Sequence, residues 1–144
     1  RQMCIRDSND TAGSMAKDSL FNAAAVVRAV TGKELSDYDI NVNFIGGGQI
    51  DGPSAGVAVT VALISAITGR AVRQDAAVTG EISVRSRVRA VGGIFEKAYG
   101  AARAGMKEMI IPSENKDDIG ASHLQMSIHA VKTVDEVLAL LLVE

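Results

Sequence analysis

The sequence contains very few residues that could form disulfides or bind metals. Its single cysteine, Cys4, has no partner within the chain, and no pair of cysteine or histidine residues has the spacing of a metal site. We therefore expect a reducing, cytoplasmic setting, with neither a metal nor another cofactor bound by this domain.

Long apolar runs and clusters of basic residues are also missing. The longest uncharged apolar segment, 55–69, is about five residues shorter than a membrane-spanning helix, and no signal peptide opens the chain. The formal net charge is -2, and the basic residues are scattered along the chain. These absences predict a protein that binds neither membranes nor nucleic acid.

Length and composition are those of one globular domain. The chain has 144 residues, of which 47% are hydrophobic and 22% charged, which is enough to form a core. Residues 1–8 show neither periodicity nor a turn signal, so we interpret them as a non-native or disordered leader. The domain itself is assigned to residues 9–144.

Apolar periodicity predicts alternating helices and strands. Helices are expected at 14–30, 54–68, 94–104 and 134–142, and strands at 38–44, 76–78, 82–84, 87–91, 109–112 and 127–131. Ser14 and Thr133 are expected N-caps, and the helix at 54–68 is apolar all round, which predicts a central helix covered on most faces. The alternation predicts one layered α+β (α/β) domain.

The segment Asp51-Gly52-Pro53-Ser54-Ala55-Gly56 contains the candidate nucleophile. Ser54 lies between glycines at the start of the apolar helix, whose N-terminal N–H groups and dipole favour an anionic acyl-transfer intermediate. A serine hydroxyl also needs a base, and histidine or lysine are the usual choices.

The sequence motif also allows a histidine as the base. Gly52-x-Ser54-x-Gly56 matches the nucleophile elbow of α/β-hydrolases, with Asp117 or Asp118 and His123 or His129 as later partners. The remaining chain is too short for the sheet of that fold, and Pro53 is unusual in such a turn. We expect both histidines to be surface residues, and no Gly-Lys-Ser/Thr supports a phosphate-binding loop.

Lys97 is the alternative base. At about 100° per residue it lies within roughly 60° of Ile94 and 40° of Ala101, beside the apolar stripe of its predicted helix. Desolvation there would lower the pKa of the lysine and allow it to accept the serine proton. On spacing alone, a lysine that extends from the helix edge to water is the favoured explanation.

Several separated segments resemble the proteolytic domain of the Lon proteases, and the likeness runs from about Gly13 to the C-terminus. They are Asp51-Gly52-Pro53-Ser54-Ala55-Gly56, Val78-Thr79-Gly80-Glu81-Ile82, Val91-Gly92-Gly93-Ile94-Phe95-Glu96-Lys97, Ala104-Gly105 and Ile110-Ile111-Pro112-Ser113-Glu114-Asn115. The resemblance implies a fold like domain 2 of ribosomal protein S5. It also implies strands before the first helix, which we expect to be missing here or replaced by residues 1–8, so that the domain is truncated at its N-terminal side. The glycines at 46–48 and the strand before them look closer to the Lon-B-like branch.

The resemblance also implies roles for individual residues. Ser54 is the implied nucleophile and Lys97 its partner, in a Ser–Lys dyad of a serine endopeptidase. Thr79 is expected to hydrogen-bond the lysine, although a strand threonine is the simpler explanation without the family. Asp51, Gly52 and Pro53 are expected to line the site, although Asp51 by itself could be an ordinary turn aspartate, and backbone N–H groups around Asp51 to Ser54 are the expected oxyanion donors. Glu81 is expected to contribute polar contacts there or to lie at an interface or at the surface.

The family context implies partners beyond this chain. Its members join this domain to an AAA+ ATPase module that uses ATP and magnesium, act on polypeptide substrates and assemble as hexamers. The chain has no phosphate-binding loop, so its own reaction would need no ATP. An alternative is a catalytically silent Lon-like domain that serves as an oligomerising scaffold.

Overall fold

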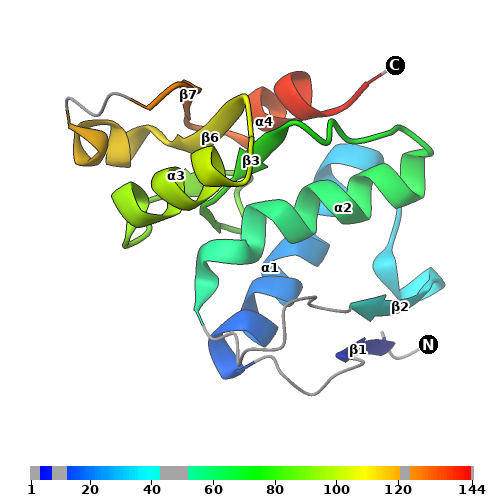
Figure 1. Ribbon diagram of the computed structural model, residues 1–144. Helices are drawn as coiled ribbons and strands as arrows, with labels where there is room; N and C mark the ends of the chain where they lie inside the picture. The colour runs from blue at the N-terminus through cyan, green and yellow to red at the C-terminus, as the bar shows by residue number, and fades with distance from the viewer. Residues whose placement is uncertain (1–3, 8–12, 43–51, 121–123, 144) are drawn as a thin grey trace.

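The computed structural model describes residues 4–7, 13–42, 52–120 and 124–143, and confirms the α+β class (Figure 1). The α-helices of this part are α1 (Ser14–Thr31), α2 (Gly56–Thr68), α3 (Ile94–Arg103) and α4 (Val134–Leu141). The strands are β1 (Cys4–Asp7), β2 (Asp39–Val42), β3 (Ala76–Val78), β4 (Glu81–Ile82), β5 (Val88–Arg89), β6 (Glu108–Pro112) and β7 (Ser127–Val131). Short 3-10 helices are η1 (Leu35–Asp37), η2 (Pro53–Ala55) and η3 (Ser113–Ile119).

A parallel sheet with the order β3-β6-β7 lies between two layers of helices (Figure 1). Successive side chains of a strand point to opposite faces. Accordingly, Met109 and Ile111 of β6 pack with Ile94 of α3, whereas Ile110 belongs to the core formed with α1, α2 and α4. All three β6 residues are buried, which explains why this strand reads as a continuous apolar run.

The other strands form two small sheets. β1 and β2 pair in parallel, and β4 and β5 form an antiparallel hairpin, in which Ile82 and Val88 are buried. The hairpin turn is closed by a hydrogen bond of 3.0 Å from Ser86 N to Ser83 O, with Ser86 at a φ of 58°.

The helix α2 is central, but the prediction that most of its faces are covered is wrong in part. Val57 and Ile64 are buried against α1, α4 and the hairpin, whereas Ala62 and Ala66 are exposed. An all-apolar run does not show which face is covered, and alanine has little apolar surface to bury. One side of α2 therefore remains open next to the candidate site.

Several predicted boundaries are corrected by the structure. The N-cap of α1 is Gly13 rather than Ser14, whereas Thr133 accepts a hydrogen bond from Glu136 N as expected. The chain bends as a 3-10 turn at Ser54 before α2 begins at Gly56. No element was expected in residues 1–8, yet Cys4–Asp7 form β1; the leader assignment itself stays a prediction. None of the described helices is long and apolar enough to cross a membrane.

Candidate active site

The backbone holds Ser54 firmly at the entrance to α2. Gly52, with a φ of 128°, precedes the 3-10 turn, and Pro53 occupies its first position, where a missing N–H costs nothing. Gly80 N donates to Ser54 O at 3.0 Å, and Val57 N donates to Gly80 O at 3.2 Å. The turn that carries the candidate nucleophile is thus joined to the β3–β4 connection.

Two glycines allow this close approach. A Cβ atom added to Gly56 would lie 2.9 Å from Ile82 Cγ2 and 3.2 Å from Ile82 N, and one added to Gly80 would lie 2.8 Å from Val88 Cγ1. These distances are shorter than van der Waals contacts allow. Gly56 therefore allows the close packing of this turn against Ile82, in addition to the change of chain direction after Ser54.

Thr79 lies beside the same turn but does not make the predicted bond. Its side chain is 6% exposed, and its Oγ1 donates to Ser54 O at 3.3 Å rather than to Lys97. The Thr79 hydroxyl and the Gly80 N–H both donate to the Ser54 carbonyl oxygen, because Thr79 and Gly80 are consecutive residues directly after β3. Thr79 thus orients the serine main chain.

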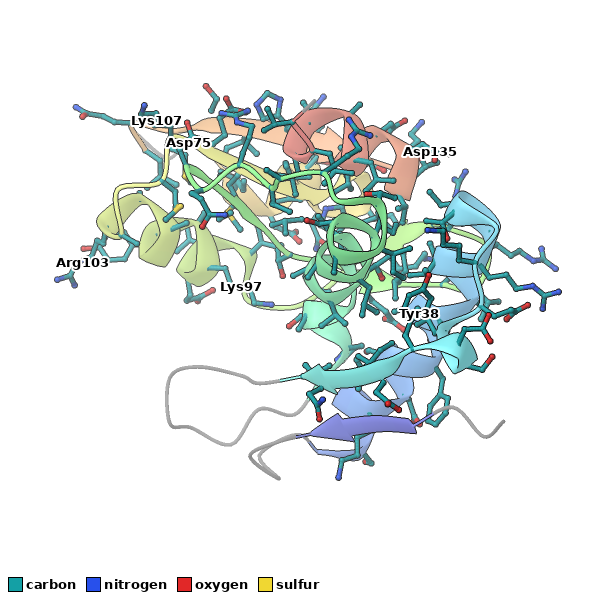
Figure 2. The ribbon with its side chains drawn as sticks, turned by 90° about the vertical axis from the view of Figure 1, so that its right-hand side faces the viewer. Tyr38, Asp75, Lys97, Arg103, Lys107 and Asp135 are labelled. Atoms are coloured by element: carbon teal, nitrogen blue, oxygen red, sulfur yellow. The ribbon has the colours of Figure 1, made fainter. Side chains whose placement is uncertain are left out.

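Lys97 projects from the first turn of α3 toward the segment that begins α2 (Figure 2). Its Nζ donates to Gly92 O at 2.9 Å, so the ammonium is held by the turn that precedes its own helix. The side chain is half-buried, and desolvation lowers the pKa of its amine below the usual lysine value. This combination favours a lysine that can lose its proton.

One pocket contains the two members of the predicted dyad. It has a volume of about 310 Å³ and is lined by Ser54, Ala55, Ala58, Ala77, Val78, Thr79, Lys97 and Met109. Ser54 and Lys97 are 43 positions apart in sequence (97 minus 54), so the fold brings them together. The described interactions of the two side chains do not include a hydrogen bond between Ser54 Oγ and Lys97 Nζ.

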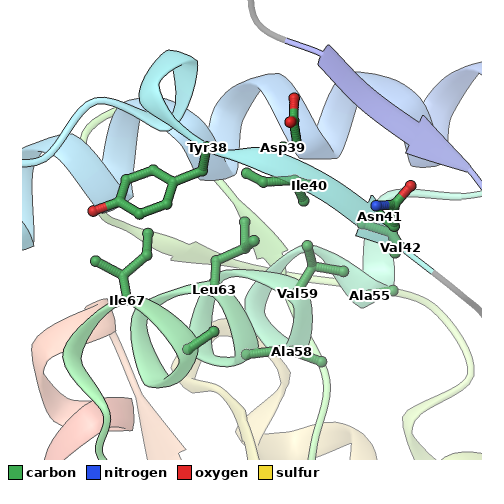
Figure 3. A pocket seen from close by; sticks show the side chains of 12 residues that line it. Tyr38, Asp39, Ile40, Asn41, Val42, Ala55, Ala58, Val59, Leu63 and Ile67 are labelled. Atoms are coloured by element: carbon green, nitrogen blue, oxygen red, sulfur yellow. The ribbon is translucent and has the colours of Figure 1, made fainter.

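A larger apolar groove adjoins this pocket between β2 and α2 (Figure 3). It has a volume of about 680 Å³ and shares Ala55 and Ala58 with the Ser54 pocket. The ring of Tyr38 lies above Ile67, while Asp39 points away from the groove. The groove leads from the apolar side of α2 to the candidate nucleophile.

Comparisons with known proteins show the family of the chain. The family model of the Lon protease (S16) C-terminal proteolytic domain matches residues 7–144. Lon protease 2 of Bacillus subtilis (strain 168) is 45% identical over 130 residues, 90% of this chain, and the Lon protease of Haemophilus influenzae is 44% identical over 138 residues, 88% of it. The archaeal Lon protease of Pyrococcus abyssi is 39% identical over 136 residues, 92% of it.

The chain belongs to the Lon proteolytic-domain family. The enzyme class expected from the sequence, a peptidase, is thereby confirmed at the level of the family. This chain spans 23%, 17% and 14% of the Bacillus, Haemophilus and Pyrococcus relatives, so it matches one part of longer proteases. Both bacterial and archaeal proteins match, and the Lon-B-like assignment stays a prediction.

The remaining predicted site residues of this Lon domain have different surroundings. Gly52 and Pro53 directly precede Ser54, and Glu81 lies half-buried at the start of β4. Asp51 and the glycines at 46–48 lie outside the described residues. These positions keep the roles expected from the sequence only as predictions.

The histidine scheme finds no support in the described residues. His129 lies on β7, where its Nε2 is 3.0 Å from Glu108 Oε2, and it does not line the Ser54 pocket. Asp118 contacts Asn115 instead of a histidine. His123 lies outside the described part of the chain.

Sequence reasoning gave no role to two groups near the site. The Gly92 carbonyl, which holds Lys97, could not be found from side-chain patterns because it is a backbone atom. Asn115 has no predicted role beyond belonging to the Ile110–Asn115 segment, although an asparagine three residues after a buried strand that ends in proline is a detectable signal.

Proposed function

We propose that Ser54 and Lys97 form the catalytic dyad of a serine endopeptidase, in the proteolytic domain of an ATP-dependent Lon-type protease that degrades unfolded or regulatory proteins. The main support is that both side chains line one pocket, in which burial lowers the pKa of Lys97. Nucleophilic acyl transfer by a serine requires a nearby base, and a lysine with a lowered pKa, in the same pocket as a serine at the start of a helix, meets this requirement.

The reaction begins when Lys97 Nζ exchanges its bond to Gly92 O for one to Ser54 Oγ. The amine takes the hydroxyl proton as Ser54 Oγ attacks the peptide carbonyl carbon. Backbone N–H groups near Asp51–Ser54 and the N-terminal end of α2 stabilise the oxyanion. Lys97 then gives the proton to the departing amine, and an acyl-enzyme on Ser54 remains.

Hydrolysis of the acyl-enzyme repeats these steps with water. Lys97, neutral again after protonating the amine, takes a proton from the attacking water. It then gives this proton to Ser54 Oγ as the tetrahedral intermediate collapses, which releases a carboxylic acid and restores the Ser54 hydroxyl. The hydrogen bonds to Ser54 O from Thr79 and Gly80 keep the serine backbone fixed throughout. Because the backbone already holds the nucleophile in place, no part of the activation free energy is needed to reorient it.

The substrate is a polypeptide in an extended conformation. The groove between β2 and α2 offers apolar surface from Tyr38, Ile40 and Leu63 and opens beside the Ser54 pocket (Figure 3). Peptide side chains placed there would hold the chain while its carbonyl reaches Ser54. Glu81 contributes polar contacts at the other side of the serine turn.

The remaining partners belong to the parent protein. ATP and magnesium act in a separate AAA+ module, because the 144 residues contain no Gly-Lys-Ser/Thr of a phosphate-binding loop, and no step above uses them. The much longer relatives support such a parent protein. We propose that it acts as a homo-hexamer in the cytoplasm. Neither nucleic acid nor membrane is proposed as a partner.

A peptide boronate tests the proposal against the scaffold alternative. Boron forms a tetrahedral adduct with an activated serine oxygen, so the probe should bind the wild-type chain and lose its affinity in Ser54→Ala. Ser65→Ala, at a half-buried position of α2 that does not line the Ser54 pocket, is the matched control and should bind normally. Stable oligomers that do not react at Ser54 would favour the scaffold and contradict the peptidase.

A further inference from the structure

Asn115 is a buried polar residue that does not line the Ser54 pocket. It is 4% exposed and lies in η3, after the end of β6. Its Oδ1 accepts from Val91 N at 2.9 Å, and its Nδ2 donates to Val91 O at 3.0 Å and to Asp118 Oδ2 at 2.5 Å. One side chain thus satisfies both backbone groups of Val91, and both of its amide hydrogens are used.

The segment held in this way leads directly to α3. Val91 precedes Gly92 and Gly93, and Gly93 has a φ of 67° as the N-cap of the helix. Glycines restrict the backbone least, so this turn needs contacts from outside to have one conformation. The backbone groups on its N-terminal side are held by the bonds of Asn115 to Val91, and an exposed bond of 3.3 Å from Ala90 N to Glu114 Oε2 adds to them. The Val91 side chain itself packs against the apolar cluster that contains Ile94.

The same turn determines where Lys97 lies. Lys97 N donates to Gly93 O at 3.0 Å, and Lys97 Nζ donates to Gly92 O at 2.9 Å. Both the backbone and the side chain of Lys97 are therefore fixed relative to the two glycines that follow Val91. Ile94 and Ala98 anchor α3 to the sheet, so loss of the turn's support would shift the lysine without dissolving the helix.

We infer that Asn115 is a positioning residue, which holds Lys97 in reach of Ser54 by clamping both peptide groups of Val91 from η3. This inference rests on the proposed dyad. Without the clamp, the Gly92–Gly93 turn samples several conformations, and the amine spends less time where it can accept the serine proton. A misplacement of the order of 1 Å in such a group is enough to slow a reaction markedly.

The test compares Asn115→Ala with Val137→Ala in the whole 144-residue chain. Val137 is fully buried in α4, in the other core, so its truncation destabilises the fold without touching the clamp. Lysines carrying ¹³C-methyl groups are titrated by NMR, with the Lys97 signal assigned from Lys97→Arg. We expect the Lys97 midpoint to move by about half a pH unit or more in Asn115→Ala and to stay in Val137→Ala.

Peptidase kinetics give the second readout. Asn115→Ala should lower kcat about tenfold with KM within about twofold, since the clamp acts on the base and not on the groove. If Asn115→Ala does not fold, Asp118→Ala tests the inference in its place. Asp118 is exposed and accepts only one hydrogen of the Asn115 amide, so its truncation changes less of the fold. An unchanged Lys97 titration and unchanged kcat in the folded variant would overturn the inference.

The two hypotheses fail in different ways. If Ser54→Ala keeps the peptidase activity, the proposed dyad is wrong whatever Asn115 does. If Ser54→Ala is inactive while the clamp variants match the wild type in both readouts, the dyad stands and only the positioning role of Asn115 is wrong.

Discussion

The hydroxyl of Thr79 donates a hydrogen bond of 3.3 Å to the carbonyl oxygen of Ser54. The same oxygen accepts from Gly80 N at 3.0 Å, so two donors at the end of β3 hold the backbone of the candidate nucleophile. Neither bond involves the serine hydroxyl, which carries the chemistry. The structure thus separates the groups that place Ser54 from Lys97, the group proposed to activate it.

Thr79→Val should reveal how much this placement matters. Valine keeps the shape of threonine but cannot donate, so the Ser54 carbonyl retains only the Gly80 N–H. A lost hydrogen bond of about 1 kcal/mol corresponds to an approximately fivefold lower kcat, with KM nearly unchanged. Steady-state peptide cleavage measures both constants. Thr79→Ser, which keeps the hydroxyl, is the control, and a valine variant with wild-type kcat would refute the role.

Gly56→Ala should destabilise the domain through a steric clash. The new Cβ would lie 2.9 Å from Ile82 Cγ2, and overpacking of this kind costs about 1–3 kcal/mol. Gly100→Ala is the matched change inside α3, where a Cβ meets nothing within 4 Å and should stabilise by about 0.5–1 kcal/mol. Urea unfolding followed by circular dichroism compares the two, and equal stabilities would contradict the close packing of the serine turn.

The pH dependence should report on Lys97. Burial lowers its pKa in the folded chain, so between this pKa and the unfolded value of about 10.4 the unfolded chain binds more protons. The contribution of Lys97 to stability therefore rises with pH through that window and is least below it. The rate of cleavage should likewise rise with pH, with a midpoint below 10.4. A rise at or above the ordinary lysine value would argue against a neutral Lys97.

Glu108→Gln should weaken the domain in a pH-dependent way. Hydrogen bonding to Arg73 at 2.8 Å lowers the pKa of Glu108, so its stabilisation is complete above its unfolded pKa of about 4.3 and is lost as the pH falls through the folded pKa. The loss of thermal stability in Glu108→Gln should be largest near pH 7 and shrink toward pH 3. Asp117→Asn, an exposed charge change in η3, is the control, and a difference that does not vary with pH would contradict the prediction.

Long periodic elements of the fold could be predicted from the sequence, whereas elements stabilised by contacts with residues distant in sequence could not. The apolar run at 109–111 and the helix ending at Gly69 appear within a few residues of their expected bounds because burial alone specifies them. The 3-10 helix η3 was not expected, since its polar sequence has no apolar period and its structure depends on the bonds between Asn115 and Val91.

For the site, sequence reasoning paired Ser54 with Lys97, which line one pocket in the structure, but it did not predict their contacts. The position of Lys97 beside the apolar stripe indicated a partly buried amine, and the structure agrees. Its bond to Gly92 O, and the bond of Thr79 to Ser54 O, could not be predicted because both acceptors are backbone carbonyls fixed by the tertiary fold.

Cleavage of an unstructured protein by the wild type, Ser54→Ala, Lys97→Ala and Lys97→Arg tests the dyad most directly. The arginine variant keeps the positive charge, but a guanidinium cannot accept a proton near neutral pH. The dyad predicts that all three variants lose cleavage although each remains folded by circular dichroism. Wild-type kcat/KM in Ser54→Ala, or in either Lys97 variant, would contradict it.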